Sequence, residues 1–277
     1  MQAPRPRRAR LRVLALLAAV AIGTAGGVVG TQHALAASDP ASAPLPRAAR
    51  LLPPSPFPRL PADARSTRVL PVVPVTVHGP HTFLSTLPDG QPVTFDPCRP
   101  IHWVVNPDGM PAGGLPLLRD AFAVVSADTG LEFQEDGDTR EPYAAQRAPR
   151  QPAYYGTGWA PVLVAWANAQ EVPELADDVV GSGGNTVMTP ADPGEARIVS
   201  GSVVLDKDFF AAALPGQAGR GQARAAVLHE LGHVVGLGHV DDRRQLMYAR
   251  DTGVLTFGPG DREGLALLGA GACHIDT

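Results

Sequence analysis

Residues 229–239 read HELGHVVGLGH, and this stretch decides how the chain is organised around its functional centre. Residues four apart lie on one face of a helix, so His229 and His233 can present two imidazole nitrogens to a single metal ion. Glu230 lies one step round the helix, from which its carboxylate can reach a metal-bound water without occupying a coordination position. The stretch therefore predicts a metal-binding helix that also carries a general base.

The third histidine requires this helix to end early. A straight helix would carry His239 about 9 Å along its axis beyond His233, out of coordinating range. Gly236 lies between them, and glycine adopts the left-handed conformation that ends helices without a side-chain cost. Three neutral imidazoles leave one tetrahedral position of Zn²⁺ open for water, as in catalytic zinc sites. We therefore expect one catalytic zinc held by His229, His233 and His239, with Glu230 as the general base.

The pattern HExxHxxGxxH followed by a methionine turn is the signature of the metzincin metallopeptidases, and this chain resembles them. Residues 245–248, Gln-Leu-Met-Tyr, resemble the Leu-Met-Tyr segment of the matrixin branch, with Met247 eight residues after His239 as in that family. The resemblance implies that Met247 lies beneath the three imidazoles as a hydrophobic floor and does not bind zinc. It extends over about residues 93–271, through a first strand and a last helix like those of secreted bacterial matrixin-like proteins.

The resemblance implies an α+β, zincin-like catalytic domain with a twisted mixed sheet of about five strands and three main helices. The apolar patterns predict strands at residues 101–105, 131–134, 162–166, 184–189 and 202–205, and helices at residues 115–129 and about 259–269. By the same resemblance, the edge strand at residues 184–189 would hold an extended substrate by backbone pairing. We expect residues 181–184 to form a flexible connection ahead of it, and residues 249–258 to form the wall of the substrate pocket.

The chain also departs from the animal matrixins. No histidine lies between His102 and His229, so their second, structural zinc is not expected here. Their Pro-Arg-Cys-Gly motif, which blocks the catalytic zinc, is absent, and the mechanism of latency is therefore open. Val240 follows the third histidine, where matrixins usually have a small hydroxylated residue.

The N-terminus has the pattern of an export signal. Five arginines among residues 5–12 precede an uncharged apolar stretch at residues 13–30. Ala34-Leu35-Ala36 offers a cleavage site before Ala37, yet the apolar stretch is also long enough to remain as a membrane anchor. We therefore expect a secreted protein, or one anchored in the cell envelope through residues 13–30.

Three regions follow from these patterns: a signal peptide or anchor at residues 1–36, a Pro/Ala-rich linker or pro-segment at 37–75, and the catalytic domain at 76–277. Between them, residues 75–95 have the pattern of short strands around a turn at residues 88–90. Removal of residues 1–36 takes away five arginines and leaves 18 basic against 27 acidic residues, a net charge of −9. No basic surface for nucleic acid is therefore expected, and the partners are protein or peptide substrates of a monomer.

The two cysteines, Cys98 and Cys273, bracket the expected catalytic domain. In an exported protein an isolated pair usually forms a disulfide. The alternative is that Cys98 is a latency switch whose thiolate caps the zinc.

Other potential ligands give weaker signals. Glu135, Asp136 and Asp138 could bind Ca²⁺, but the full calcium-loop pattern is absent, so a solvated acidic turn is expected and calcium stays unsupported. His78 and His81 have the spacing of a ligand pair, yet no other ligand is near in sequence, and we expect both to be solvent-exposed.

Two further interpretations compete with a peptidase. An amphipathic helix with incidental histidines would require five specified residues at fixed spacing to arise by chance, in roughly one chain in ten thousand or fewer. A zinc-binding envelope or interaction module could instead keep the ligands and the fold but cleave nothing. The intact Glu230 argues against such a module, while the lack of a visible latency device favours it.

Overall fold

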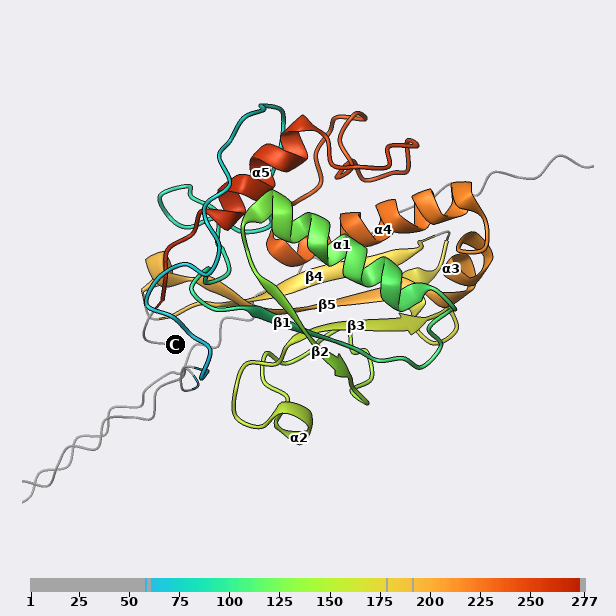
Figure 1. The fold of residues 1–277 in the computed structure, drawn as a ribbon, viewed down its shortest axis with the longest axis horizontal. Coiled ribbons are helices and arrows are strands. Elements are labelled where there is room, and N and C mark those ends of the chain that lie inside the picture. Colours follow the sequence, from blue (N-terminus) through green and yellow to red (C-terminus); the bar gives the residue numbers. More distant parts are fainter. Residues whose placement is uncertain (1–57, 59–60, 178, 191, 275–277) are drawn as a thin grey trace, which may run out of the picture. The chain divides into compact units, whose positions relative to one another are not determined.

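Five strands form one mixed sheet in the computed structural model, which describes residues 58, 61–177, 179–190 and 192–274 (Figure 1). The order across the sheet is β2 (Phe133–Asp138), β1 (Ile101–Val105), β3 (Val162–Ala167), β5 (Arg197–Asp206) and β4 (Gly181–Met188). The first four are parallel to one another, whereas β4 runs antiparallel to β5 and forms an edge of the sheet. The predicted mixed sheet of about five strands is confirmed.

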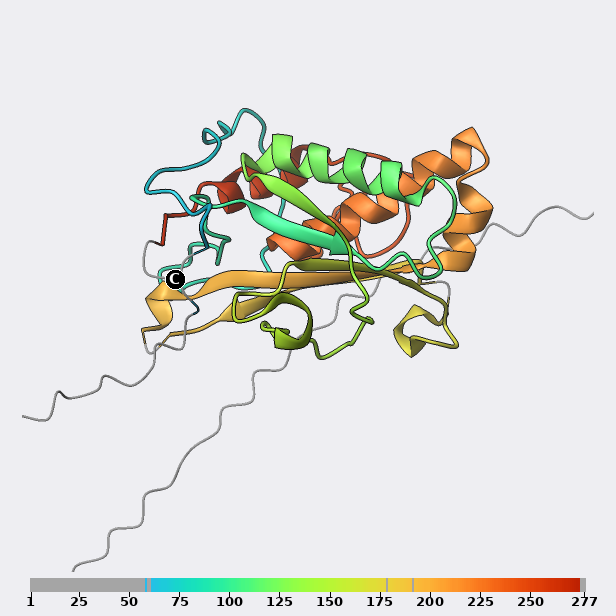
Figure 2. The ribbon, with the colours of Figure 1, turned by 60° about the horizontal axis from the view of Figure 1, so that its bottom comes forward.

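Three long helices cover one face of this sheet (Figure 2). They are α1 (Gly114–Thr129), α4 (Gln217–Val235) and α5 (Pro259–Gly269). Shorter helical segments are α2 (Pro152–Tyr155), η1 (Pro173–Leu175), η2 (Pro193–Glu195) and α3 (Lys207–Ala213). The arrangement is the α+β class that the sequence predicts, with α4 as the helix that carries the HELGH residues.

The core lies between the sheet and these helices because the buried faces of both are apolar. The apolar stripe of α1, formed by Leu118, Phe122 and Val125, is buried, and the Phe122 ring stacks on Trp103 of β1 with centroids 4.2 Å apart. All six residues of β3 are buried, as expected for a central parallel strand whose two faces are both covered. Of the five strands, β5 and the edge strand β4 are the ones on which α4 chiefly packs.

Residues 61–77 form no helix or strand and lie against the domain. The backbone N–H groups of Arg65 and Val69 donate to the carbonyls of Cys98 and Pro97, at 2.7 and 3.0 Å. The Arg68 guanidinium donates to the carbonyls of Gly269 and Gly271 after α5, at 2.7 and 3.2 Å. These contacts join the start of the described chain to its end.

Cys98 and Cys273 form a disulfide with Cα atoms 5.3 Å apart. The predicted pairing is confirmed, and the alternative of a free Cys98 thiolate is wrong. The expected signal or anchor at residues 1–36 lies outside the described residues, and no described helix is long and apolar enough to span a bilayer. The three-region division stays a prediction.

Several local expectations are corrected. Residues 75–95 do not form strands but make isolated bridges, such as Thr86 with Pro92 across the turn at residues 88–90. Residues 181–184 are not a flexible connection, because β4 already begins at Gly181. Phe83 and Phe95 bridge to Leu237 and Ile198, and β4 pairs with β5, so contacts distant in sequence rather than the local pattern decide these conformations.

The expected acidic turn is also wrong, because its residues belong to β2 and are paired. Glu135 accepts from Arg119 at 2.6 and 2.8 Å, and Asp136 accepts from His102, whose other ring nitrogen faces Asp63 at 2.7 Å. β2 begins at Phe133, two residues later than predicted.

The two isolated histidines differ. His78 is 77% exposed, as expected, and its ring contacts Glu263 of α5 at 2.8 Å. His81 is only 20% exposed, because it packs beside the Phe83 ring and the same glutamate, so the expectation of a solvent-exposed His81 is wrong.

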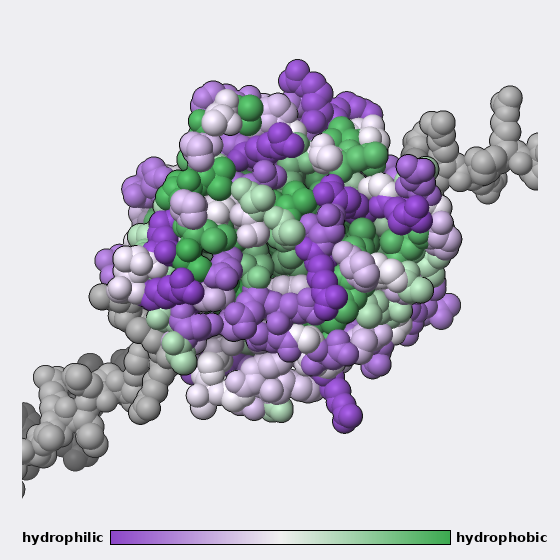
Figure 3. Space-filling view, in the orientation of Figure 1, coloured by the Kyte–Doolittle hydropathy of each residue, from purple (hydrophilic) through white to green (hydrophobic). Residues whose placement is uncertain are grey.

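Hydrophobic and hydrophilic residues are interspersed over the face of the domain drawn in Figure 3. Within the described residues, the large hydrophobic side chains that remain exposed are Val72, Val75, Val77, Tyr154 and Leu255. Leu255 belongs to the 249–258 loop, next to the site described below.

Candidate metal centre

The helix α4 ends where the sequence predicts. Its last residue is Val235, and Gly236 follows with a φ of 122°, in the region that side chains rarely adopt. The N–H groups of Gly236 and Leu237 both donate back to the Gly232 carbonyl, at 3.1 and 2.8 Å. The chain therefore reverses within one turn and returns His239 to the other histidines.

The three imidazoles converge on one point. The Nε2 atom of His229 lies 3.1 Å from Nε2 of His233 and 3.2 Å from Nε2 of His239, and the remaining pair is also 3.2 Å apart. Nitrogens bound to one tetrahedral zinc at about 2.0–2.1 Å would lie about 3.3–3.4 Å from one another. The donor set and its spacing therefore fit a zinc ion.

Backbone carbonyls fix the orientation of two of the rings. Nδ1 of His229 donates to the Leu246 carbonyl at 2.7 Å, and Nδ1 of His233 donates to the Leu237 carbonyl at 2.8 Å. A carbonyl can only accept, so each of these Nδ1 atoms carries the proton and each Nε2 presents its lone pair. The rings are thus held in the tautomer that a metal requires.

Burial keeps the histidines uncharged. It lowers the pKa of His229 well below its ordinary value of 6.5, with a further contribution from neighbouring His233. It lowers the pKa of His233 to about 4 and also lowers that of the more exposed His239. Neutral rings are the form that binds a metal, so no proton has to be displaced near neutral pH.

Glu230, which follows His229 in α4, is completely buried. Burial raises the pKa of its carboxyl to about 8, with an opposing effect from the Gly183 backbone N–H. Within the described part of the chain neither carboxylate oxygen has a hydrogen-bond partner of good geometry, so the effect of Gly183 is electrostatic rather than a well-formed hydrogen bond. Only the ionised carboxylate can accept a proton, and a cation held by the three imidazoles would favour that form and lower the pKa again.

Met247 is buried against the same turn of α4. A Cβ atom at Gly232 would lie 2.6 Å from the Met247 sulfur, so this glycine makes room for the methionine between the two helical histidines. The contact accords with the expected floor, and the identification of the segment as a methionine turn stays a prediction.

The carboxylate of Asp261, in the first turn of α5, holds the loop that contains Met247. It accepts from the N–H groups of Leu246, Gly258 and Met247, at 2.6, 2.9 and 3.4 Å. From the sequence, Asp261 was predicted only to lie in the helix at about residues 259–269, although an acidic residue three positions into a helix often accepts from the cap. Asp261 therefore supports the metal centre indirectly, because it holds the loop whose Leu246 carbonyl orients His229.

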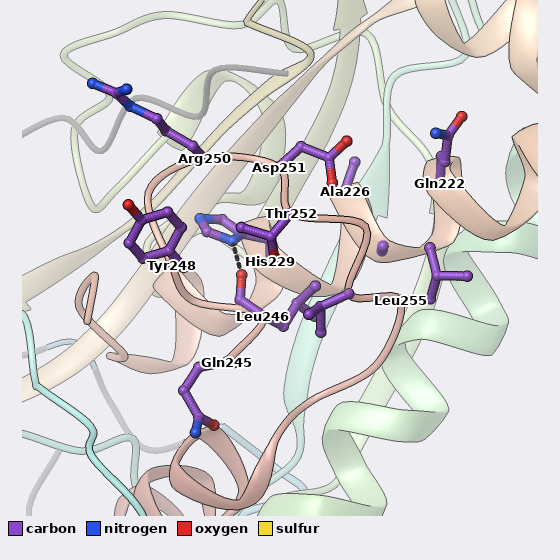
Figure 4. A pocket seen from close by; sticks show the side chains of 12 residues that line it. Gln222, Ala226, His229, Gln245, Leu246, Tyr248, Arg250, Asp251, Thr252 and Leu255 are labelled. Atoms are coloured by element: carbon purple, nitrogen blue, oxygen red, sulfur yellow. Dashed lines mark hydrogen bonds between the residues drawn. The ribbon is translucent and has the colours of Figure 1, made fainter. Parts of the chain in front are cut away.

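A pocket opens beside His229 (Figure 4). Its walls come from α4, from residues 245–248 and from the loop at residues 249–258 in which the sequence placed the pocket wall. Ala225, Ala226, Leu246, Val254 and Leu255 give it an apolar lining, while Arg250 and Asp251 add polar groups. Its empty volume is about 430 Å³, open solvent included.

No protein-family model matches the chain, and no curated protein matches its sequence. Among solved structures 58 chains match. One is the crystal structure of metalloproteinase-II from Bacteroides fragilis, 15% identical, with a TM-score of 0.32, where the match covers 64% of this chain and 53% of that one. The match thus spans about half the length of that protein. A likeness this distant carries no argument about activity, which must come from the site itself.

Proposed function

We propose that this chain is a zinc-dependent endopeptidase of the metzincin type, exported from the cell, that hydrolyses peptide bonds in protein substrates. The observation that carries the proposal is the convergence of three neutral imidazole Nε2 atoms, 3.1–3.2 Å apart, together with the buried Glu230 that follows His229 in α4. His229, His233 and His239 would hold the metal. The disulfide between Cys98 and Cys273 suits the oxidising compartment that export implies.

The chemistry divides between the metal and one carboxylate. When bound, zinc would lower the pKa of its water ligand and polarise the scissile carbonyl. Glu230 accepts the proton of the attacking water on a carboxylate oxygen and then delivers it to the nitrogen of the leaving amine. Neither carboxylate oxygen makes a hydrogen bond of good geometry within the described residues, which leaves both oxygens available to the attacking water.

The surroundings favour an extended peptide as substrate. β4 pairs with β5 on one side and, within the described residues, has no strand on the other, so its open edge can accept a peptide in β conformation. Asn185 of β4 donates to the His233 carbonyl at 3.1 Å, which ties this edge to the metal-binding helix. The apolar pocket beside His229 would take a side chain of the peptide.

The decisive experiment compares Glu230→Gln with the wild-type full chain, purified after export and loaded with zinc, on a broad peptide library. The amide keeps the shape of the side chain but cannot accept the proton, so we expect cleavage to fall by roughly 10²–10⁴-fold. Zinc content should remain one ion per chain. Glu195→Gln changes an exposed glutamate in η2 and should leave cleavage unchanged.

Chelation should abolish cleavage in the wild type, and added zinc should restore it. Stoichiometric zinc in a folded chain that cleaves no peptide would overturn the proposal and favour the zinc-binding module. Equal activity of the wild type and Glu230→Gln would exclude Glu230 as the base.

A further inference from the structure

Glu230 packs against the edge strand β4 at two glycines, Gly181 and Gly183, which have no side chains. A Cβ atom built on Gly181 would lie 2.9 Å from Cγ of Glu230 and 3.3 Å from both Cδ and Oε1. A Cβ atom on Gly183 would lie 2.5 Å from the backbone oxygen of Glu230 and 2.9 Å from its Cβ. Any other residue at either position would therefore collide with Glu230.

The alternation of the strand explains why these two glycines act together. Successive side chains of a strand point to opposite faces, so positions 181 and 183 face α4 while position 182 faces away. Ser182 accordingly hydrogen-bonds the Tyr143 side chain, which packs with residues outside the main core. Gly184 falls on the same face as Ser182, and a Cβ atom there would meet nothing within 4 Å.

Backbone freedom does not account for the glycines. Gly181, Gly183 and Gly184 have no left-handed φ, so each could adopt its conformation with a side chain. Glycine weakens a strand, and its presence there usually marks a close approach of another group. At Gly181 and Gly183 that group is the residue expected to carry the proton.

We propose that Gly181 and Gly183 form a steric slot in β4 that positions the Glu230 carboxylate for proton transfer. The slot, defined by these two glycines, replaces the hydrogen bonds that usually orient a catalytic carboxylate and that Glu230 lacks within the described residues. Proton transfer requires a fixed distance between the carboxylate and the proton that it accepts. The glycines of β4 on one side and the backbone of α4 on the other would hold the Glu230 carboxylate at that distance. The two glycines are positioning residues, and this inference rests on the proposed function.

The first test compares Gly181→Ala with Gly158→Ala in the zinc-loaded full chain. The methyl group at position 181 pushes the carboxylate aside, so we expect kcat to fall by about tenfold to 100-fold, with KM and zinc stoichiometry close to wild type. Gly158→Ala adds the same methyl group outside β4 and α4, where a Cβ atom would meet nothing within 4 Å, and should leave kcat unchanged. Equal kcat values for the two variants, in a chain that cleaves peptides, would overturn the positioning role.

The second test uses thermal unfolding and needs no activity. Gly181→Ala should lower the Tm in the wild-type background but not in Glu230→Ala, which lacks the Cγ, Cδ and Oε1 atoms that the methyl group meets. Gly183→Ala meets backbone oxygen and Cβ, so its loss of Tm should persist in both backgrounds.

The two tests separate the two possible failures. If the wild type cleaves no peptide, the proposed function fails, and the thermal comparison still decides whether the slot packs on Glu230. If Gly181→Ala lowers the Tm equally in both backgrounds, the side chain of Glu230 does not occupy the slot and the inference is wrong.

Discussion

Gly236 shows how one residue sets the geometry of the site. Its φ of 122° ends α4, and a Cβ atom there would lie 2.7 Å from the Leu268 side chain. We expect Gly236→Ala to destabilise the protein through a backbone cost of about 1–2 kcal/mol and a packing cost of about 1–3 kcal/mol. Urea unfolding after removal of zinc measures both costs without a contribution from the metal.

Gly90→Ala is the matched control for this prediction. Gly90 also has a positive φ, of 87°, but a Cβ atom there would meet nothing within 4 Å. Only the backbone cost should appear in that variant. Equal losses of unfolding free energy in the two variants would show that the contact with Leu268 does not constrain the turn.

The residues of the metal centre were predictable for a physical reason. A metal requires its ligands at fixed spacing, and His229, His233 and Gly236 satisfy that requirement within a single helix and its end. Gly181 was misread because its role depends on a contact with α4, and nothing in the local sequence encodes that contact. Glycine-rich sequences occur both in edge strands and in flexible connections, so the local sequence does not distinguish the two.

At the scale of elements, α5 stabilises the loop that orients the first ligand. Asp261 accepts from the backbone of Leu246, and the carbonyl of Leu246 accepts from His229. Asp261→Asn replaces one accepting oxygen by an NH₂ group that faces a backbone donor, so we expect the loop to shift and zinc affinity to fall by roughly 10–100-fold. Competition with a chromophoric chelator measures this affinity.

Asp89→Asn is the comparison for that experiment, because Asp89 is exposed in a turn and accepts only from the nearby N–H of Gln91 among the described contacts. Its zinc affinity should equal that of the wild type. If Asp261→Asn also binds zinc as the wild type does, then α5 contributes to folding alone and the proposed link to His229 is absent.

The elements themselves were predicted unevenly. β1, β3 and α1 match their predicted ranges to within one residue, because their apolar patterns reflect burial along the whole element. Residues 75–95 have an equally β-rich composition, yet they make only isolated bridges, with partners such as Leu237 and Ile198 far along the chain. Whether an apolar run becomes a strand depends on a neighbouring strand that composition does not reveal.

At the scale of the whole molecule, the start and the end of the described chain are joined twice. The Arg68 guanidinium donates to carbonyls that follow α5, and the disulfide joins Cys98 to Cys273 across 175 residues. The pairing was predictable because the chain has only two cysteines, whereas the role of Arg68 was not, because residues 37–75 have the composition of a linker.

Removal of this disulfide should lower stability without changing the metal centre. In the chain-entropy model a closed loop of this length stabilises the folded state by about 5 kcal/mol, because the unfolded chain loses conformational freedom. We expect the double variant Cys98→Ser/Cys273→Ser to lose about that much unfolding free energy in urea, while zinc affinity at low temperature stays that of the wild type, since His229 and His233 are positioned by α4.

The double variant is preferred to a single one, because it leaves no free thiol to form mixed disulfides. A loss below about 1 kcal/mol would indicate that the unfolded chain retains structure even without the disulfide, so that the bond restricts it little further. A parallel loss of zinc affinity would show that the metal centre depends on the closed loop.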